Sequence, residues 1–346
     1  MPRDTAPTRK LVHVVVTRNF AGVERHVAGV ARETAERGWR VTVVGGAPAA
    51  MRRSLGDVAD WLPGGTPLEA LRSLARVGRV DVCHAHMTLA ETVAVAGRPF
   101  HRAPVVATRH FGAHRGQTRV GGAVAPWIAR RVARELAVSE FVAGRMERPP
   151  HAVVPNGVPA GPLSWRPESR VVLLLQRLER EKDTLTALRA WRECGLESAG
   201  WSLRIAGDGS ERRALEAWVA TNGVPGVDFA GWREDPAAEL AAAGILLATA
   251  PSEPFGLAVV EAMVAGVPVV AAAGGAHLET VGLLPDVPLF PPGDAAAAAE
   301  ALRRLADPDL RARLSEAGRG LALERFTLGA SVDRLLAEYD LVGAEA

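Results

Sequence analysis

The hydrophobic positions of the chain fall into short continuous runs that alternate with longer segments of helical period. The first run, residues 11–16, is apolar at nearly every position, as expected of a parallel strand that is covered on both faces. A loop and a helix over residues 24–37 follow it, and the next apolar run covers residues 41–44. This β-loop-α-β order predicts the start of a doubly wound sheet.

Strand and helix patterns alternate in the same way over the rest of the first half. A basic helix is expected to end near Glu135. It carries Arg115, Arg119, Arg130 and Arg131 with Trp127, and it is either a solvated helix or a surface that faces an acceptor or a membrane. The further predicted strands of this half are residues 80–83, 105–108, 136–138 and 152–154.

A polar, proline-bearing linker at residues 162–167 precedes a second series of strands, which begins at residues 171–175. The sequence therefore predicts an α/β protein with two Rossmann-like doubly wound domains that face each other across a cleft. The expected domains are residues 1–161 and 162–326, and residues 327–346 form a C-terminal helix that packs back across their junction.

One stretch of the second half combines two carboxylates with a helix start. Glu253 lies in a Ser-Glu-Pro-Phe-Gly turn, and a helix is expected to begin at Gly256 and to end at Gly266. The free N–H groups at such a helix start bind anions, and Glu261 lies about one turn further on. A ligand with both an anion and hydroxyls, such as a phosphorylated sugar, suits this arrangement. The alternative is that Glu261 is an ordinary solvated residue, but the Ala-Met-Val-Ala-Gly that follows leaves the helix little polar face.

Two cations follow the first strand of the second half. Arg177 comes directly after that strand, and Lys182 is one of only two lysines in a chain that otherwise uses arginine. A lysine at this position indicates that a compact ammonium is needed. The two charges would neutralise a diphosphate without a metal, although a surface charge cluster that includes Arg180 is the alternative. Trp232 and Arg233 end a later strand, where they would flank a base.

Three histidines of the first half, His84, His86 and His110, lie at the C-terminal ends of predicted strands, where open α/β sheets bind ligands. His84 and His86 share a strand face, so they form a conceivable metal pair. No third ligand is evident nearby in the sequence, and we expect no metal. His110, directly after Arg109, is the better candidate for contact with a ligand.

Composition and charge limit the partners and the location that the protein is expected to have. The chain has 346 residues, of which 48% are hydrophobic, enough for two cores. Through Ala160 it carries 23 Lys and Arg against 12 Asp and Glu, and the remainder carries 18 against 27. The basic half suits an anionic acceptor, phosphate groups or a membrane surface. Nucleic acid is not expected, because no binding motif accompanies the charge and aromatic residues are few. Two cysteines, a polar N-terminus and no long apolar stretch predict a cytoplasmic protein, with peripheral membrane contact through the basic half as an open alternative.

These residues together resemble the retaining glycosyltransferases of family 4, which have the two-Rossmann-domain GT-B fold. The most specific match runs from Glu253-Pro-Phe-Gly through Glu261-Ala-Met to Gly266-Val-Pro-Val-Val. Supporting matches are Arg177-Leu with Lys182, Pro-Asn-Gly-Val at residues 155–158, Gly-Asp-Gly-Ser at residues 207–210, and Gly22 with Glu-Arg-His at residues 24–26. Two departures are Ala21, where the family usually has glycine, and Gln176, which replaces a common glycine.

The resemblance implies a metal-independent hexosyltransferase that needs no cofactor. It would take a nucleotide-diphospho-sugar, most simply a UDP-sugar, in the second domain and a sugar, cyclitol or lipid-linked acceptor in the first. Arg177 and Lys182 would stabilise the leaving diphosphate, Glu261 would bind the ribose, and Glu253 would bind the transferred sugar. The further implied residues are Phe255, Leu257 and Gly256 with their backbone N–H groups, Gly22 near the phosphates, and His110 near the reacting centre. The acceptor-side candidates, taken from the loops of the first domain, are Asn19, His84, His110 and Arg115.

Other functions fit parts of this pattern. A pseudo-glycosyltransferase or a sugar-nucleotide epimerase would share the fold and the donor residues. A non-catalytic nucleotide-sugar-binding partner is a third reading, but it has less need of the cations at Arg177 and Lys182. A nicotinamide dehydrogenase is disfavoured because the first loop lacks the G-x-G-x-x-G fingerprint.

Overall fold

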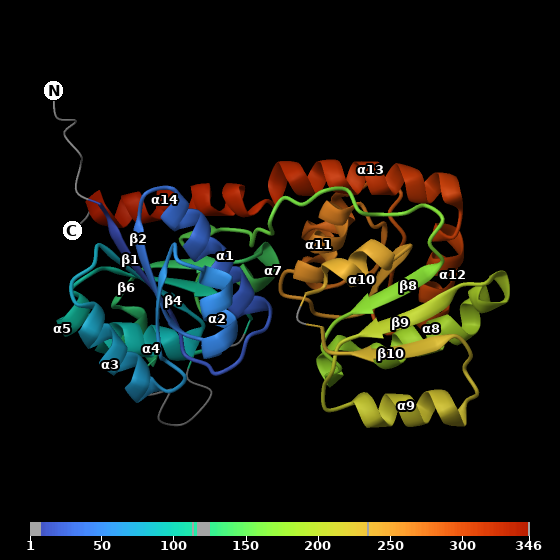
Figure 1. Ribbon diagram of the computed structural model, residues 1–346, viewed down its shortest axis with the longest axis horizontal. Coiled ribbons are helices and arrows are strands. Elements are labelled where there is room, and N and C mark those ends of the chain that lie inside the picture. Colours follow the sequence, from blue (N-terminus) through green and yellow to red (C-terminus); the bar gives the residue numbers. More distant parts are fainter. Residues whose placement is uncertain (1–7, 113, 116–124, 234, 345–346) are drawn as a thin grey trace. The chain divides into compact units, whose positions relative to one another are not determined.

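The computed structural model describes residues 8–112, 114–115, 125–233 and 235–344. The chain divides into two compact units, the first made of residues 1–159 with 327–346 and the second of residues 160–326 (Figure 1). Each unit is described by itself.

Unit 1 is built on a seven-stranded parallel sheet with the strand order β3-β2-β1-β4-β5-β6-β7. The order reverses between β1 and β4, as in a doubly wound sheet. The bounds are β1 (Lys10–Val15), α1 (Gly22–Glu36), β2 (Arg40–Gly45), α2 (Pro48–Leu55), β3 (Asp60–Leu62), α3 (Pro67–Val77), β4 (Val82–His86), α4 (Thr88–Ala96), α5 (Arg98–His101), β5 (Val105–Arg109), β6 (Val132–Ala137), α7 (Glu140–Ala143), β7 (Ala152–Val153) and α14 (Leu328–Ala344).

Two cores cover the two faces of this sheet, because successive side chains of a strand point to opposite faces. Leu11 of β1 packs in a cluster with residues of α1, α2 and α14, whereas Val12 packs in a cluster with residues of α3 and α4. The segment before α14 contacts the chain at Gly157, where a Cβ would lie 2.4 Å from the carbonyl oxygen of Thr327. A glycine is therefore required for the segment before α14 to run beside residues 157–158.

Unit 2 repeats this architecture with a six-stranded parallel sheet in the order β10-β9-β8-β11-β12-β13. The reversal here falls between β8 and β11. The predicted fold class, two Rossmann-like α/β domains, is confirmed. The bounds are β8 (Val171–Leu175), η1 (Arg180–Lys182), α8 (Thr184–Cys194), η2 (Leu196–Ala199), β9 (Ser202–Ala206), α9 (Arg212–Thr221), β10 (Val227–Gly231), α10 (Ala237–Ala242), β11 (Ile245–Ala248), α11 (Leu257–Ala265), β12 (Val269–Ala272), η3 (Gly275–Glu279), η4 (Val281–Leu283), β13 (Leu289–Phe290), α12 (Ala295–Leu305) and α13 (Pro308–Arg325).

The predicted basic helix ending near Glu135 is wrong. Residues 125–129 are helical, but residues 132–137 form β6 at the end of the basic segment. The charged residues of this strand have partners elsewhere, since Arg134 pairs with Glu338 of α14 and Glu135 pairs with Arg109 of β5. These long-range ion pairs stabilise charged side chains on β6. For this reason the local sequence, read alone, does not predict a strand there. Arg119 lies outside the described residues.

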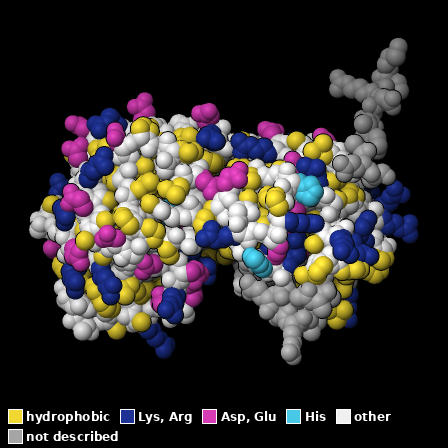
Figure 2. Space-filling view, turned by 180° about the vertical axis from the view of Figure 1, so that it is seen from behind, with side chains coloured by type: hydrophobic (Ala, Val, Ile, Leu, Met, Phe, Trp, Pro, Cys, Tyr) yellow, Lys and Arg dark blue, Asp and Glu magenta, His cyan; other side chains and the backbone are white. Residues whose placement is uncertain are grey.

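The surface carries charges of both signs. On the face drawn in Figure 2, Lys and Arg side chains are interspersed with Asp, Glu and hydrophobic side chains. Within the described ranges, no helix combines the length and the apolar character that crossing a bilayer requires.

Candidate functional site

The two loops at the strand-order reversal of unit 2 bring a lysine and a glutamate together. The loop after β8 carries Lys182, and the loop after β11 carries Glu253. Lys182 Nζ donates a hydrogen bond of 2.6 Å to Glu253 Oε2, and the side chains are 17% and 15% exposed. Ligands of open α/β sheets bind at this reversal, outside the carboxyl ends of the strands. We call this pair and its surrounding loops the Lys182 site.

Gln176 fixes the backbone that carries Lys182. Its Nε2 donates to the carbonyl oxygen of Lys182 at 3.0 Å and to Thr184 Oγ1 at 3.1 Å. Thr249 Oγ1, on the loop after β11, donates to the same carbonyl at 2.9 Å. Gln176, which replaces a glycine common in the family, thus holds the loop after β8 that carries Lys182. The sequence did not indicate this role.

The Gly-Asp-Gly-Ser turn after β9 packs against the loop that leaves β8. A Cβ on Gly207 would lie 1.8 Å from the carbonyl oxygen of Gln176, and one on Gly209 would lie 2.3 Å from that of Leu178. Ser210 donates from its backbone N–H at 3.0 Å and from its hydroxyl at 2.5 Å to the two carboxylate oxygens of Glu179. Hydrogen bonds from Ser210 lower the pKa of Glu179. The glycines are needed because the two backbones touch.

The backbone of the turn that carries Glu253 contacts η3. The backbone N–H of Ala276 donates to the carbonyl oxygen of Glu253 at 2.8 Å. Gly275 has φ +60°, and its Cβ would lie 2.3 Å from the same oxygen. His277, buried at 1% exposure, donates from Nδ1 to the carbonyl oxygen of Ala272. Burial lowers the pKa of His277, and nearby Glu253 opposes the change. His277 is a site residue that sequence reasoning missed, since its only local signal is the Gly-Gly pair after β12.

The predicted helix start at Gly256 is confirmed. Gly256 is the N-cap of α11 with φ +89°, and Gly266 is its C-cap with φ +83°. His277 Cδ2 would lie 3.3 Å from a Cβ on Gly256, so this helix start lies beside both His277 and Glu253. Phe255 is buried against Phe326, with ring centroids 6.0 Å apart. Leu257 begins α11, and Glu261 lies one turn along it.

The other predicted residues of unit 2 have different partners. Arg177 is on the lysine loop, where its Nη2 donates to Glu181 Oε1 at 2.6 Å and the side chain stays 55% exposed. Trp232 is 56% exposed and follows β10, the edge strand of the sheet. Arg233 Nε donates to Glu239 Oε1 at 2.8 Å. The structure thus brings Lys182, Glu253 and the start of α11 together and places Trp232 and Arg233 at the sheet edge.

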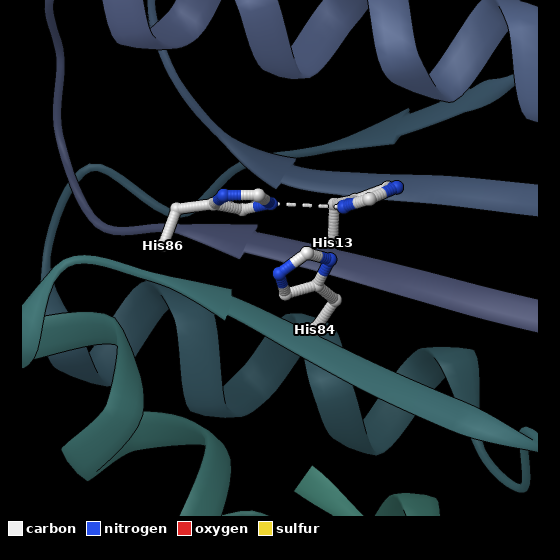
Figure 3. Close-up of side chains that lie close together, drawn as sticks. All are labelled: His13, His84 and His86. Atoms are coloured by element: carbon white, nitrogen blue, oxygen red, sulfur yellow. Dashed lines mark hydrogen bonds between the residues drawn. The ribbon is translucent and has the colours of Figure 1, made fainter. Parts of the chain in front are cut away.

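Unit 1 holds a cluster of buried histidines at its own strand-order reversal: His13 on β1, His84 and His86 on β4, His110 after β5 and His26 on α1. Figure 3 shows the first three with their rings turned toward one another. His13 Nδ1 lies 2.9 Å from His86 Nε2, and His86 Nδ1 lies 3.0 Å from His110 Nε2. Burial lowers the pKa of His13 and His110 to about 3 and that of His26 to about 4, so the rings are neutral near pH 7.

A third possible metal ligand, which the sequence did not make evident, lies near His84 and His86. Among the described residues, His13, His84 and His86 offer ligand atoms within 4.8 Å of one another. Hydrogen bonds already occupy the facing nitrogens of His13 and His86. Those of His84 lie 2.6 Å from Tyr339 Oη and 2.8 Å from Thr108 Oγ1. The arrangement therefore fits a hydrogen-bonded network better than an ion site.

The remaining predicted residues of unit 1 divide into exposed and buried positions. Asn19 is exposed in the loop before α1, and Gly22 is the first residue of that helix. The Arg115 side chain is instead only 6% exposed and lies in an ion network. Its Nε is 2.6 Å from Glu91 Oε2 and its Nη2 is 2.5 Å from Glu135 Oε1. Burial would raise the pKa of nearby Glu147, but hydrogen bonds from the Arg115 backbone and the Arg109 side chain lower it to about 2.

Comparison with known proteins identifies the family. The family model described as glycosyl transferases group 1 matches residues 161–321, and the one described as glycosyltransferase family 4 matches residues 20–161. The chain is 29% identical to the phosphatidyl-myo-inositol mannosyltransferase of Mycobacterium leprae, over 93% of each chain. It is 31% identical to the 2-deoxystreptamine glucosyltransferase of Streptomyces kanamyceticus, over 50% of this chain and 46% of that one.

Solved structures show the same fold. Anabaena Alr3699/HepE in complex with UDP and glucose has a TM-score of 0.78 at 20% identity, covering 95% of this chain and 98% of that one. The sucrose-phosphate synthase of Thermosynechococcus elongatus has a TM-score of 0.76 at 21% identity, covering 98% and 100%. With both units matched in sequence by glycosyltransferase models and in fold by GT-B structures, the chain belongs to the glycosyltransferases of the family 4 type.

Proposed function

We propose that the protein transfers a hexose from a nucleotide-diphospho-sugar, a UDP-sugar in the simplest case, to a small-molecule or lipid-linked acceptor, with retention of anomeric configuration. The observation that carries the proposal is the contact of Lys182 with Glu253 beside the N-terminus of α11. A cation, a carboxylate and free helix N–H groups at one place match a donor that has a diphosphate joined to hydroxyl-bearing groups. The bound UDP and glucose of the Anabaena structure support this class of donor, and the name of the mycobacterial relative, a mannosyltransferase, supports the transfer of a hexose.

Each group has a role in the proposed transfer. Lys182 exchanges its contact with Glu253 for the donor diphosphate, and Arg177 leaves Glu181 to reach the same phosphates. The bond between the anomeric carbon and the diphosphate oxygen breaks, its electron pair stays on the diphosphate, and the two cations stabilise that charge without a metal. The acceptor hydroxyl oxygen bonds to the anomeric carbon on the face that the diphosphate leaves, and its proton passes to the diphosphate oxygen. Glu253, released from Lys182, accepts hydrogen bonds from hydroxyls of the sugar. Glu261 accepts those of the ribose.

The test measures nucleotide release from UDP-glucose, UDP-galactose, UDP-N-acetylglucosamine and GDP-mannose in EDTA, together with donor affinity by calorimetry. Lys182→Met should lower turnover about a hundredfold or more, because it removes charge that stabilises the leaving group. Donor affinity should change much less.

Arg180→Ala is the matched control, since Arg180 is an exposed cation of the same η1 turn. Near-normal turnover of Lys182→Met in EDTA would exclude the leaving-group role. The anomeric signal of the first-formed product in proton NMR reports retention, and an inverted product would contradict that part of the proposal.

A further inference from the structure

Three histidines of unit 1 form a continuous line of hydrogen-bonded rings. His13 Nδ1 contacts His86 Nε2 at 2.9 Å, and the other nitrogen of His86 contacts His110 Nε2 at 3.0 Å. The line begins in the interior, where His13 and His86 are 0% and 1% exposed, and ends at His110, which keeps 4% of its surface exposed. The three rings come from β1, from β4 and from the residue after β5, which are neighbours in the sheet.

The proton positions in this line are coupled. A neutral imidazole has one N–H donor and one nitrogen acceptor. When His86 accepts from His13 it must donate to His110, and when it donates to His13 it must accept from His110. All three rings therefore carry the proton on Nδ1, or all three carry it on Nε2.

His13 Nε2 decides between the two arrangements. This atom is buried and has no hydrogen-bond partner. If the rings carried their protons on Nε2, His13 would bury an N–H with no acceptor. Buried donors without partners are rarer in proteins than buried acceptors that lack a donor. The arrangement with Nδ1–H on every ring leaves only a bare acceptor at the buried end, and it is therefore favoured.

We propose that His13 and His86 are positioning residues that hold His110 as the Nδ1–H tautomer. The nitrogen of His110 that does not face His86 is then a neutral hydrogen-bond donor, suited to a hydroxyl or phosphate oxygen of a bound substrate. It cannot take up a proton there, so His110 does not act as a general base. Only the assignment of that oxygen to a sugar-nucleotide or acceptor substrate rests on the proposed function.

The tautomers are measurable in the full chain by nitrogen-15 NMR of labelled histidines, at pH 7.5 in EDTA. The protein contains its own references. His101 Nε2 donates to the carbonyl oxygen of Ala94 while its Nδ1 accepts from the N–H of Ala103, which fixes the Nε2–H form. His277 Nδ1 donates to the carbonyl oxygen of Ala272, which fixes the Nδ1–H form. We expect His13, His86 and His110 to give the pattern of His277. The pattern of His101, or that of charged rings, at His110 would overturn the proposal.

Two variants test the direction of control. His13→Asn keeps an amide N–H near the position of Nδ1, whereas His13→Leu removes the donor. We expect His86 and His110 to stay in the Nδ1–H form in His13→Asn and to lose it in His13→Leu. Persistence of that form in a folded His13→Leu protein would show that His13 does not position His110.

Activity gives a second, separable readout. Turnover in His13→Leu should fall about tenfold, the equivalent of one hydrogen bond, with donor KM unchanged, and His13→Asn should restore it. The expected tautomers in a protein that transfers no sugar would refute the proposed function and leave the tautomer assignment standing. An active protein with Nε2–H at His110 would refute the assignment alone.

Discussion

Acidification from pH 7.5 to pH 5.5 should destabilise unit 1 far more than unit 2. The five clustered histidines are at most 8% exposed, and burial lowers the pKa of each, to about 3 for His13 and His110 and about 4 for His26. In the unfolded chain a histidine has a pKa of about 6.5. Below that pH the unfolded chain binds protons that the folded chain does not. The stabilisation is therefore complete above about pH 6.5 and is lost as the pH falls toward the folded values.

The size of the effect follows from linkage. At pH 5.5, one imidazole with a folded pKa far below that pH lowers the free energy of unfolding by about 1.4 kcal/mol relative to neutral pH. Five such rings together give about 7 kcal/mol, which is comparable to the whole stability of an ordinary domain. Unit 2 contains a single histidine, His277, so the same acidification should cost it about 1.4 kcal/mol at most.

Hydrogen–deuterium exchange with mass spectrometry measures the stability of the two units separately. After correction for the intrinsic pH dependence of exchange, opening free energies from peptides of β1 and β4 should fall by several kcal/mol between the two pH values. Those from β8 and β11 should change little. The variant His13→Asn should lose about 1.4 kcal/mol of this pH dependence. Equal losses in both units, or an unchanged dependence in the variant, would refute the view that the cluster is kept neutral by burial.

Three further substitutions test the packing and the site. Gly275→Ala should destabilise unit 2 by about 1–3 kcal/mol in thermal unfolding, because at φ +60° its Cβ would strike the Glu253 backbone. Gly293→Ala, at φ +80° with open space around it, should cost less, and equal losses would contradict the clash. Arg115→Met should cost unit 1 about 3–5 kcal/mol in urea denaturation, since it removes the nearest cation of the buried Glu91 carboxylate and leaves Arg109 at 4.0 Å, and a loss under about 1 kcal/mol would argue against that. Glu261→Gln should weaken nucleotide binding about tenfold in calorimetry, and an unchanged affinity would remove its proposed ribose contact.

Local signals in the sequence predicted the features that depend on neighbours along the chain. Continuous apolar runs mark parallel strands because both faces of such a sheet are covered, so both sheets could be anticipated. The start and end of α11 followed from Gly256 and Gly266, since both adopt the left-handed backbone that favours glycine at helix caps. The strand β6 could not be found in this way. Its Arg134 and Glu135 are satisfied by Glu338 and Arg109, which are far away in the sequence.

The sequence by itself thus determined the fold class and the residue types of the candidate site, whereas tertiary structure decided which of them meet. Lys182 and Glu253 are 71 positions apart, and they touch because β8 and β11 are adjacent at the reversal of strand order. His13 looks like an interior position of an apolar strand. His13 joins the buried histidines of β4 because β1 pairs with β4, and this pairing places His13 opposite His84. Strand order and register are properties of the whole sheet, so no local pattern contains them.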